Sequence, residues 1–382
     1  MRNLPFGKPI IGPEEKAAVC QVMDSGVLAH GPQVHAFEEA FAACAGGGQA
    51  VALSSCTAAL HLAYFCLGIG AGDEVIVPAQ THVATAHAVA LAGAKPVFVD
   101  AEPRTGNLDL EQVSAAITPR TRAISLVHFL GMPVDMAALL VVARRHGLRV
   151  VEDCALALGT KVDGVHAGLH GDCGCFSFYP VKHFTTAEGG AFLARDAALA
   201  KHVASCRAFG MDKGLGQRTV PGMYDILELG FNYRMNDLQA AIGVQQLKRL
   251  PGFLAARARN HERLTAGLRQ IPGVSLLASS TPRLQSSYYC HTAILDDRLA
   301  PHRVAIMAAL KERGIGTSIY YPRPVPLMTY YREKYGYRPE QFPVANRISS
   351  QSIALPVGPH LGLDDMDYIA AALKDIVQKV TP

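Results

Sequence analysis

The stretch Phe176-Ser-Phe-Tyr-Pro-Val-Lys182-His-Phe-Thr-Thr-Ala-Glu188-Gly-Gly190 places one lysine in a segment that cannot be an ordinary helix. Its proline, Pro180, disfavours helix for the residue before it, and its two closing glycines suit tight backbone turns. Aromatic and apolar residues surround Lys182, and removal of water lowers the pKa of a lysine amine. The stretch therefore predicts a lysine on a loop whose neutral amine can react with an aldehyde.

An acidic residue ends the buried strand that is predicted over Val150-Val-Glu-Asp153. Taken singly, Asp153 suits the cap of a following helix, and Lys182 suits a solvated surface position. Taken together, an aspartate at a strand end and a lysine on a later loop suggest pyridoxal 5'-phosphate. This cofactor uses a lysine for its aldehyde and a carboxylate for its protonated ring nitrogen.

Composition favours a globular protein and argues against two classes of partner. The chain has 382 residues, 49% of them hydrophobic, which is enough for one large and one small domain. A formal net charge of +4 without a Lys/Arg run gives no support for binding a nucleic acid polymer. No apolar run approaches the length of a membrane span. We therefore expect neither nucleic acid nor membrane among its partners.

The cysteines indicate a reducing environment. Nine of them are scattered along the chain, and residues 1–8 lack the apolar segment of a secretory signal, so we expect a cytoplasmic protein. One group, formed by Cys154, His170, Cys173 and Cys175, invites comparison with a zinc site. Its spacing lacks the paired CxxC arrangement, so we expect small buried thiols and no metal.

Strand and helix patterns alternate along the first part of the chain. Continuously apolar strands are expected where a parallel sheet is buried on both faces, and amphipathic helices connect them. The predicted strands cover 50–53, 74–78, 96–100, 123–128 and 149–152. The helices between them are predicted over 57–67, 85–91, 110–116 and 137–145, after a first helix over 14–23. This order predicts an α/β fold with a largely parallel sheet.

The pattern changes after Asn236. Two long helices are predicted over 237–250 and 253–271, because Pro251 and Gly252 stand between them. Strands over 292–295 and 316–320 flank a helix over 300–313. This part predicts a smaller α+β domain.

Several segments, in this order, resemble the sugar aminotransferases of the family named after DegT and StrS. The resemblance runs from about Pro9 to near the C-terminus. The matching segments are Gly72-Asp-Glu-Val-Ile-Val-Pro78, Gly93-Ala-Lys-Pro-Val-Phe-Val-Asp100, Val151-Glu-Asp-Cys-Ala155, the Lys182 stretch, Asn232-Tyr-Arg-Met-Asn236 and Leu238-Gln-Ala-Ala-Ile-Gly243. The resemblance implies the type I fold of enzymes that use pyridoxal 5'-phosphate. It comprises a large domain (1–250) with a mostly parallel seven-stranded sheet and a small C-terminal α+β domain (251–382).

The resemblance also implies roles for individual residues. Lys182 matches the catalytic lysine that binds the cofactor, and Asp153 matches the aspartate that pairs with its ring nitrogen. The phosphate group requires hydrogen-bond donors, and a helix start after a strand supplies them. The implied phosphate ligands are Thr57, Ala58, Ser177 and, from the partner subunit of a homodimer, the residue equivalent to Asn232.

Three positions depart from the family pattern. His82 stands where an aromatic residue usually stacks on the cofactor ring, and imidazole adds a titratable group there. Leu156 replaces a residue that usually hydrogen-bonds near the ring oxygen, and Tyr320 replaces a frequent histidine. Because of these departures, the sequence does not predict which side chains adjust the reactivity of the cofactor.

The implied reaction moves an amino group from L-glutamate to a keto sugar in a ping-pong mechanism. The sequence Thr185-Thr-Ala-Glu-Gly-Gly190 resembles members that aminate C4 of a nucleotide-linked 4-keto-6-deoxy sugar, rather than C3. The glycine-rich loop over 211–224, with Lys213 and Arg218, is a candidate cover for a diphosphate, although a solvated loop fits equally well.

Three other functions fit the residues less well. In dehydratase relatives a histidine replaces the lysine, whereas Lys182 is present here and His183 occupies a different position. A non-catalytic binding or regulatory protein on the same scaffold has only Leu156 in its favour. A nicotinamide oxidoreductase lacks the expected GxGxxG after the first strand.

Overall fold

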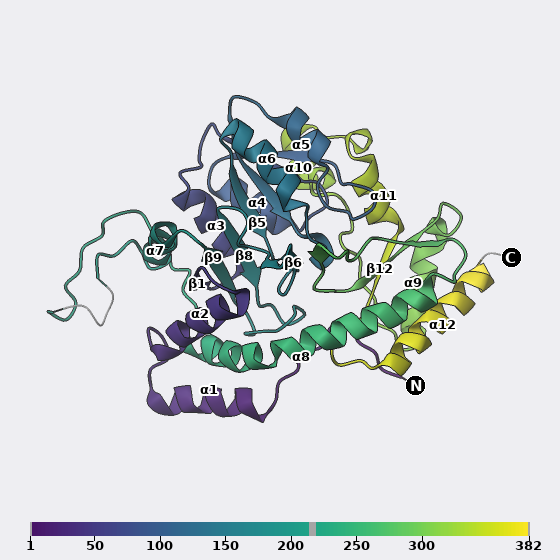
Figure 1. The fold of residues 1–382 in the computed structure, drawn as a ribbon, viewed down its shortest axis with the longest axis horizontal. Coiled ribbons are helices and arrows are strands. Elements are labelled where there is room, and N and C mark those ends of the chain that lie inside the picture. Colours follow the sequence, from purple (N-terminus) through teal and green to yellow (C-terminus); the bar gives the residue numbers. More distant parts are fainter. Residues whose placement is uncertain (1, 214–218, 381–382) are drawn as a thin grey trace.

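A seven-stranded sheet forms the centre of the larger part of the molecule (Figure 1). The computed structural model describes residues 2–213 and 219–380. The strand order is β1-β9-β8-β5-β4-β2-β3; β9 is antiparallel to both of its neighbours, and the other four pairings are parallel. The strands are β1 (Gln49–Leu53), β2 (Glu74–Pro78), β3 (Lys95–Val99), β4 (Thr121–Val127), β5 (Arg149–Asp153), β8 (Cys173–Ser177) and β9 (Gly190–Ala194). The predicted α/β fold with a mostly parallel seven-stranded sheet is confirmed.

Helices cover both faces of this sheet, as its apolar strands require. Successive side chains of β2 point to opposite faces of the sheet. Val75 and Val77 pack with α3 and α4 on one face, and Ile76 packs with α5 and α6 on the other. Phe37 and Phe41 of α2 extend the second face. The helices are α1 (Pro13–Ser25), α2 (Pro32–Ala45), α3 (Cys56–Cys66), α4 (Val83–Leu91), α5 (Leu110–Ala116), α6 (Met136–His146) and α7 (Ala197–Cys206).

A second core lies in the C-terminal part, around a three-stranded antiparallel sheet of order β10-β12-β13. The N-terminal segment joins it, because Leu4 donates to and accepts from the backbone around Ile315. The elements are β10 (Val274–Leu276), β12 (His291–Leu295), β13 (Ser352–Leu355), α9 (Arg303–Glu312), α10 (Thr329–Tyr335), α11 (Pro343–Gln351) and α12 (Leu363–Val380). A small sheet of β11 (Leu284–Gln285), β6 (Lys161–Val162) and β7 (Val165–His166) links the two parts.

The prediction of two helices separated at Pro251 was wrong. One helix, α8 (Asp237–Leu268), runs through Pro251 and crosses the molecule (Figure 1). Proline removes one backbone hydrogen bond, but Leu250 and Phe253 on either side of it are buried in one core. The first half of α8 packs on α1 and α2 and the second on α12, and this burial outweighs the lost bond.

The predicted strand over 316–320 was also wrong. Within this segment Ser318 forms an isolated bridge with Ala354, with backbone hydrogen bonds of 3.1 and 2.8 Å in the two directions. A single residue pair does not extend the sheet into a further strand. No helix in the described ranges 2–213 and 219–380 is both long enough and apolar enough to cross a membrane.

Candidate active site

A cavity of about 280 Å³ lies at the carboxyl ends of the parallel strands. Strands β4, β5 and β8 each contribute their last residue to its wall, namely Val127, Asp153 and Ser177. This edge is where open α/β sheets bind ligands, because the connecting loops diverge there. Five of the seven predicted site residues line it: Lys182, Asp153, Thr57, Ser177 and His82.

Asp153 is 3% exposed, and two hydrogen bonds fix the position of its carboxylate. The hydroxyl of Thr85 donates to Asp153 Oδ2 at 2.7 Å, and the backbone amide of Ala155 donates to Oδ1 at 3.0 Å. Thr81 Oγ1 lies 2.6 Å from Thr85 Oγ1, so Thr81 donates to Thr85. These contacts hold the carboxylate in place at the wall of the cavity.

The loop that follows β8 carries Lys182 and is held by backbone hydrogen bonds. The amide of Lys182 donates to Tyr179 O at 2.9 Å, and Phe178 and Gly189 are joined by a bond of 3.0 Å. Burial lowers the pKa of the Lys182 amine, although the nearby Cys56 and Asp153 oppose the shift. The direction of this pKa shift agrees with the expectation that the Lys182 amine loses its proton more readily than the amine of a solvated lysine.

The turn from β1 into α3 presents hydrogen-bond donors to the cavity. Ser55 is the N-cap of α3, and its hydroxyl accepts from the amide of Ala58 at 3.1 Å. The amide of Ala58 is thus occupied, whereas the amides of Cys56 and Thr57 have no acceptor within the helix and are available to an anion beside Thr57. Gly190 passes very close to this turn, because a Cβ there would lie 2.3 Å from the carbonyl carbon of Ser55. Only glycine allows this approach.

Two of the three positions that depart from the family pattern line the cavity, and the third does not. His82 is the N-cap of α4, and its ring lies 5.6 Å from the ring of Tyr321. Leu156 lines the wall as an apolar, buried side chain. Tyr320 lies behind Tyr321, where its hydroxyl is 2.7 Å from that of Tyr289, and does not line the cavity within the described part of the chain.

Asn232 lies outside this cavity. It is exposed, and it forms a bridge with Ala208 in the segment that follows α7. Figure 1 shows this segment extending away from the body of the molecule. In the same segment Lys213 is exposed, and Arg218 lies outside the described residues.

Thr85 is a site residue that the sequence analysis did not identify. Its only sequence signal is a hydroxyl one helical turn after Thr81, and such pairs are common at helix starts. We expect Thr85→Val to lower kcat/KM for amino transfer about tenfold, because a hydrogen bond to a charged group contributes about 1.5–3 kcal/mol. Thr85→Ser keeps the hydroxyl and should retain most of the rate. Steady-state kinetics of both variants test this, and equal rates for the Val variant and the wild type would contradict it.

Glu152 points to the opposite face of the sheet from Asp153, since neighbouring strand residues alternate. Its buried carboxylate accepts from the amides of Gly168, His170 and Gly171 at 2.7–2.8 Å and lies 2.9 Å from His128 Nε2. Burial alone would raise the pKa of this carboxyl, but His128 and the amides hold it below its ordinary value. Glu152 is therefore a structural acid.

We expect Glu152→Ala to lower the free energy of unfolding by about 3–5 kcal/mol, because it leaves buried donors without an acceptor. Glu262→Ala, on the exposed face of α8, should change it by less than about 0.5 kcal/mol. Because the folded-state pKa of Glu152 is depressed, its stabilisation is present above the ordinary pKa and is lost as the pH falls through the folded-state value. Urea unfolding at several pH values measures both effects. A stable Glu152→Ala variant would show that the amides find another acceptor.

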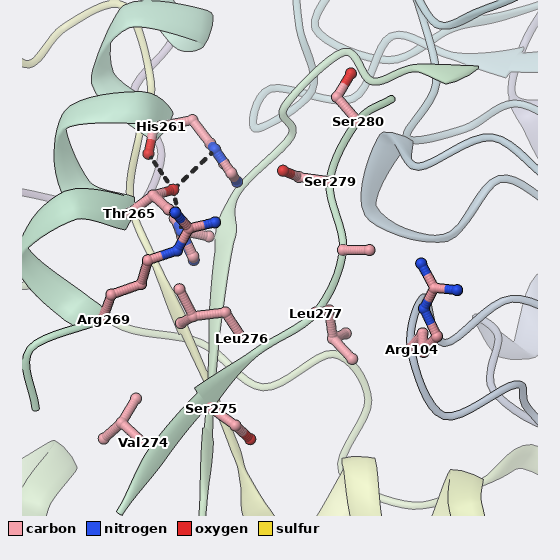
Figure 2. A pocket seen from close by; sticks show the side chains of 12 residues that line it. Arg104, His261, Thr265, Arg269, Val274, Ser275, Leu276, Leu277, Ser279 and Ser280 are labelled. Atoms are coloured by element: carbon pink, nitrogen blue, oxygen red, sulfur yellow. Dashed lines mark hydrogen bonds between the residues drawn. The ribbon is translucent and has the colours of Figure 1, made fainter. Parts of the chain in front are cut away.

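A larger cavity, of about 490 Å³, lies between the two parts of the molecule. Figure 2 shows Arg104 and Arg269 on opposite sides of it, with the hydrogen bonds of Thr265 at one end. Its lining residues include neither Lys182 nor Asp153. The smaller cavity is therefore the candidate active site.

Comparison with known proteins decides the family. A model of the DegT/DnrJ/EryC1/StrS aminotransferase family matches residues 9–374. The chain belongs to this family. It is 38% identical to the spore coat polysaccharide biosynthesis protein SpsC of Bacillus subtilis, over 98% of this chain and 97% of that protein. The predicted family resemblance is confirmed.

Two solved structures show the same fold. The putative sugar aminotransferase Spr1654 of Streptococcus pneumoniae, in its PMP form, has a TM-score of 0.94 and 29% identity over 99% of this chain and 100% of that chain. The DesV structure of S. venezuelae, in complex with a ketimine intermediate, has a TM-score of 0.87 and 35% identity over 96% and 94% of the two chains. The chain has the type I fold, and its cofactor is pyridoxal 5'-phosphate, as predicted.

The cavity suits this cofactor. It offers a lysine amine for the aldehyde, a buried carboxylate for the ring nitrogen, and the donors of the α3 turn with Thr57 and Ser177 for the phosphate. Apolar atoms of Leu60, Val127 and Leu156 border the space between these groups. The residue types and their common location therefore fit the group.

Proposed function

We propose that this aminotransferase moves the amino group of L-glutamate to a nucleotide-linked keto sugar by a ping-pong mechanism. The observation that carries the proposal is the single cavity that unites Lys182 with Asp153 at the strand ends. The SpsC relative acts in polysaccharide biosynthesis, and Spr1654 is a putative sugar aminotransferase, which supports a sugar as the acceptor. The nine cysteines are free in the structure, in keeping with a site of action in the reducing cytoplasm.

The proposed roles follow from chemistry and position. Pyridoxal 5'-phosphate supplies an aldehyde and an aromatic ring that accepts electrons. Lys182 binds it through Nζ and, once released by the amino donor, moves a proton to and from the substrate carbon. Asp153 would accept the N–H of the protonated ring nitrogen, while Thr85 holds this carboxylate in position. Thr57 and Ser177 would bind the phosphate, and His82 would border the ring. Ala58, also predicted as a phosphate ligand, does not line the cavity, and its amide already donates to the Ser55 hydroxyl.

We propose C4 of a 4-keto-6-deoxy sugar as the position aminated. Glu188 of the Thr185–Gly190 segment lines the cavity with an exposed side chain, so this segment is placed to contact the acceptor. The test incubates the enzyme and glutamate with nucleotide-linked 4-keto and 3-keto sugars and identifies the amino sugar by mass spectrometry and NMR. Amination of only the 3-keto sugar would contradict the C4 assignment, and amination of neither would contradict a nucleotide-linked acceptor.

The active site is proposed to need two subunits, because Asn232 is exposed and does not line the cavity of its own subunit. In a homodimer each Asn232 would reach the phosphate in the other subunit. We expect Lys182→Ala and Asn232→Ala chains to be impaired alone and to regain activity when co-expressed. The mixed dimer then contains one site with both residues intact.

Size-exclusion chromatography with light scattering shows whether mixed dimers form, and differently tagged chains allow their isolation. About half the wild-type activity per mixed dimer is expected, since one of two sites is complete. If Asn232 acts within its own subunit, isolated mixed dimers should remain as impaired as the Asn232→Ala protein.

A further inference from the structure

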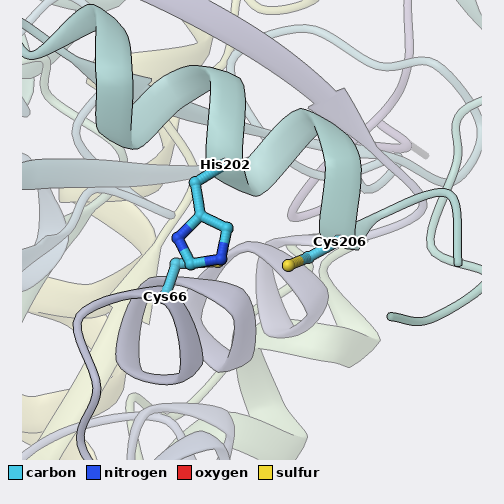
Figure 3. A group of neighbouring side chains, drawn as sticks. All are labelled: Cys66, His202 and Cys206. Atoms are coloured by element: carbon cyan, nitrogen blue, oxygen red, sulfur yellow. The ribbon is translucent and has the colours of Figure 1, made fainter. Parts of the chain in front are cut away.

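Three metal-binding side chains meet at the far ends of two helices, away from the active-site cavity. Cys66 is the last residue of α3, and His202 and Cys206 lie one turn apart on the same face of α7 (Figure 3). One ligand atom from each of the three residues lies within 4.8 Å of those from the other two. Tetrahedral zinc, with bonds of about 2.0–2.3 Å, holds its ligand atoms about 3.5–4 Å apart. The cluster therefore needs only small side-chain shifts to surround one ion.

Glu228 supplies a fourth donor from a different segment. Its Oε2 lies 2.7 Å from His202 Nε2, and its carboxylate also contacts the Cys206 thiol. The His202 and Glu228 side chains are 39% and 33% exposed, so an ion can reach the cluster from solvent. Two sulfurs, one imidazole and one carboxylate form a donor set that is typical of zinc in proteins.

A second cluster of potential metal ligands differs from the first in its burial and in its hydrogen bonds. His128, Glu152 and Cys154 also approach one another, but all three are buried. The Glu152 oxygens are already occupied by three backbone amides and His128. Neither an entry path nor an unoccupied carboxylate remains there. At the Cys66 cluster the His202 and Glu228 side chains are partly exposed, and the contacts of Glu228 with His202 and Cys206 are ones that a bound ion would replace.

We propose that Cys66, His202, Cys206 and Glu228 bind one zinc ion in tetrahedral coordination. On binding, each thiol gives its proton to solvent and ligates as a thiolate. The ion takes the place of the proton between His202 Nε2 and Glu228, and the neutral imidazole then carries its proton on Nδ1. Two thiolates and one carboxylate then surround a divalent cation, and no electron transfer is involved. The ion is structural, because all four positions are filled by protein.

Zinc at this position would fasten the segment after α7. The amide of Phe231 donates to Cys206 O at 2.6 Å, so this segment already meets α7 at the proposed site. Glu228 and Asn232 lie on this same segment. A bond from Glu228 to the ion would therefore restrain the residues that project from the body of the molecule.

The test is the zinc content of tag-free holoenzyme, measured by inductively coupled plasma mass spectrometry after growth with added zinc and extensive dialysis. We expect about one zinc per chain in the wild type and in Cys20→Ser, a control at an exposed cysteine. Cys66→Ser and His202→Gln should lower the zinc content at least about tenfold. His202 is half-exposed, so its replacement should not prevent folding, and circular dichroism checks this.

A titration of chelator-treated protein with zinc provides an independent measurement. One site per chain, with release of protons into weakly buffered solution, is expected for the wild type and is expected to be lost in Cys66→Ser. The proposal is overturned if the wild type neither contains zinc nor binds it at micromolar concentrations. It is equally overturned if Cys66→Ser retains the wild-type zinc content, or if Cys66 and Cys206 form a disulfide in the purified protein.

Discussion

Lys182→Ala should abolish amino transfer, with a loss of at least about 1,000-fold in kcat. The substitution removes both the amine that binds the cofactor and the group that moves the proton, and general acid–base catalysis alone contributes about 10²–10⁴-fold. The loop should survive, because its backbone hydrogen bonds at Tyr179 and Phe178 do not involve the lysine side chain. The measurement is single-turnover and steady-state kinetics with glutamate as donor.

Two further variants separate the chemistry of Lys182 from its charge. Lys182→Arg keeps a positive charge that is not lost near neutral pH, so it should be as inactive as Lys182→Ala. Lys201→Ala, on the exposed side of α7, should retain wild-type kinetics. Activity in Lys182→Arg within about tenfold of wild type would show that a neutral amine at this position is not required.

Asp153→Ala should lower kcat about 100-fold to 1,000-fold while the cofactor stays bound. Loss of one preorganised electrostatic contact in a water-excluded site typically costs this much. Asp153 is buried and hydrogen-bonded by Thr85 and Ala155, so its carboxylate is held in the position where we propose that it pairs with the ring nitrogen. The phosphate donors and Lys182 are untouched, which is why binding should persist.

Cofactor content and turnover must be measured on the same sample of Asp153→Ala. Asp163→Ala is the matched control, because Asp163 pairs with Arg283 at the surface and lies outside the cavity. An Asp153→Ala enzyme with the wild-type rate would mean that the ring nitrogen has another partner.

The parallel sheet and the two residues Asp153 and Lys182 could be predicted from the sequence, because their positions depend on local sequence patterns. Strand-end position places Asp153 at one edge of a parallel sheet, and the proline and glycines around Lys182 place it on a loop at the same edge. Thr57 and Ser177 were predicted from the family resemblance rather than from such patterns.

Contacts between distant segments could not be predicted from such patterns. The hydroxyl of Thr85 reaches Asp153 only because the fold brings the start of α4 to the end of β5, and the continuity of α8 through Pro251 depends on burial contributed by other helices. The Cys66 cluster joins two helices that are far apart in the sequence, and its cysteines lack any recognisable spacing. These features arise from packing rather than from local propensity.

The most direct test of the central claim is the visible absorption spectrum of the purified protein before and after excess L-glutamate. We expect a yellow protein whose colour bleaches as the cofactor is converted to the pyridoxamine form, whereas Lys182→Ala should lack this response. A yellow band that ignores glutamate would contradict the proposed donor. A protein that remains colourless after addition of pyridoxal 5'-phosphate would contradict the account of Lys182 and its cavity as the cofactor site.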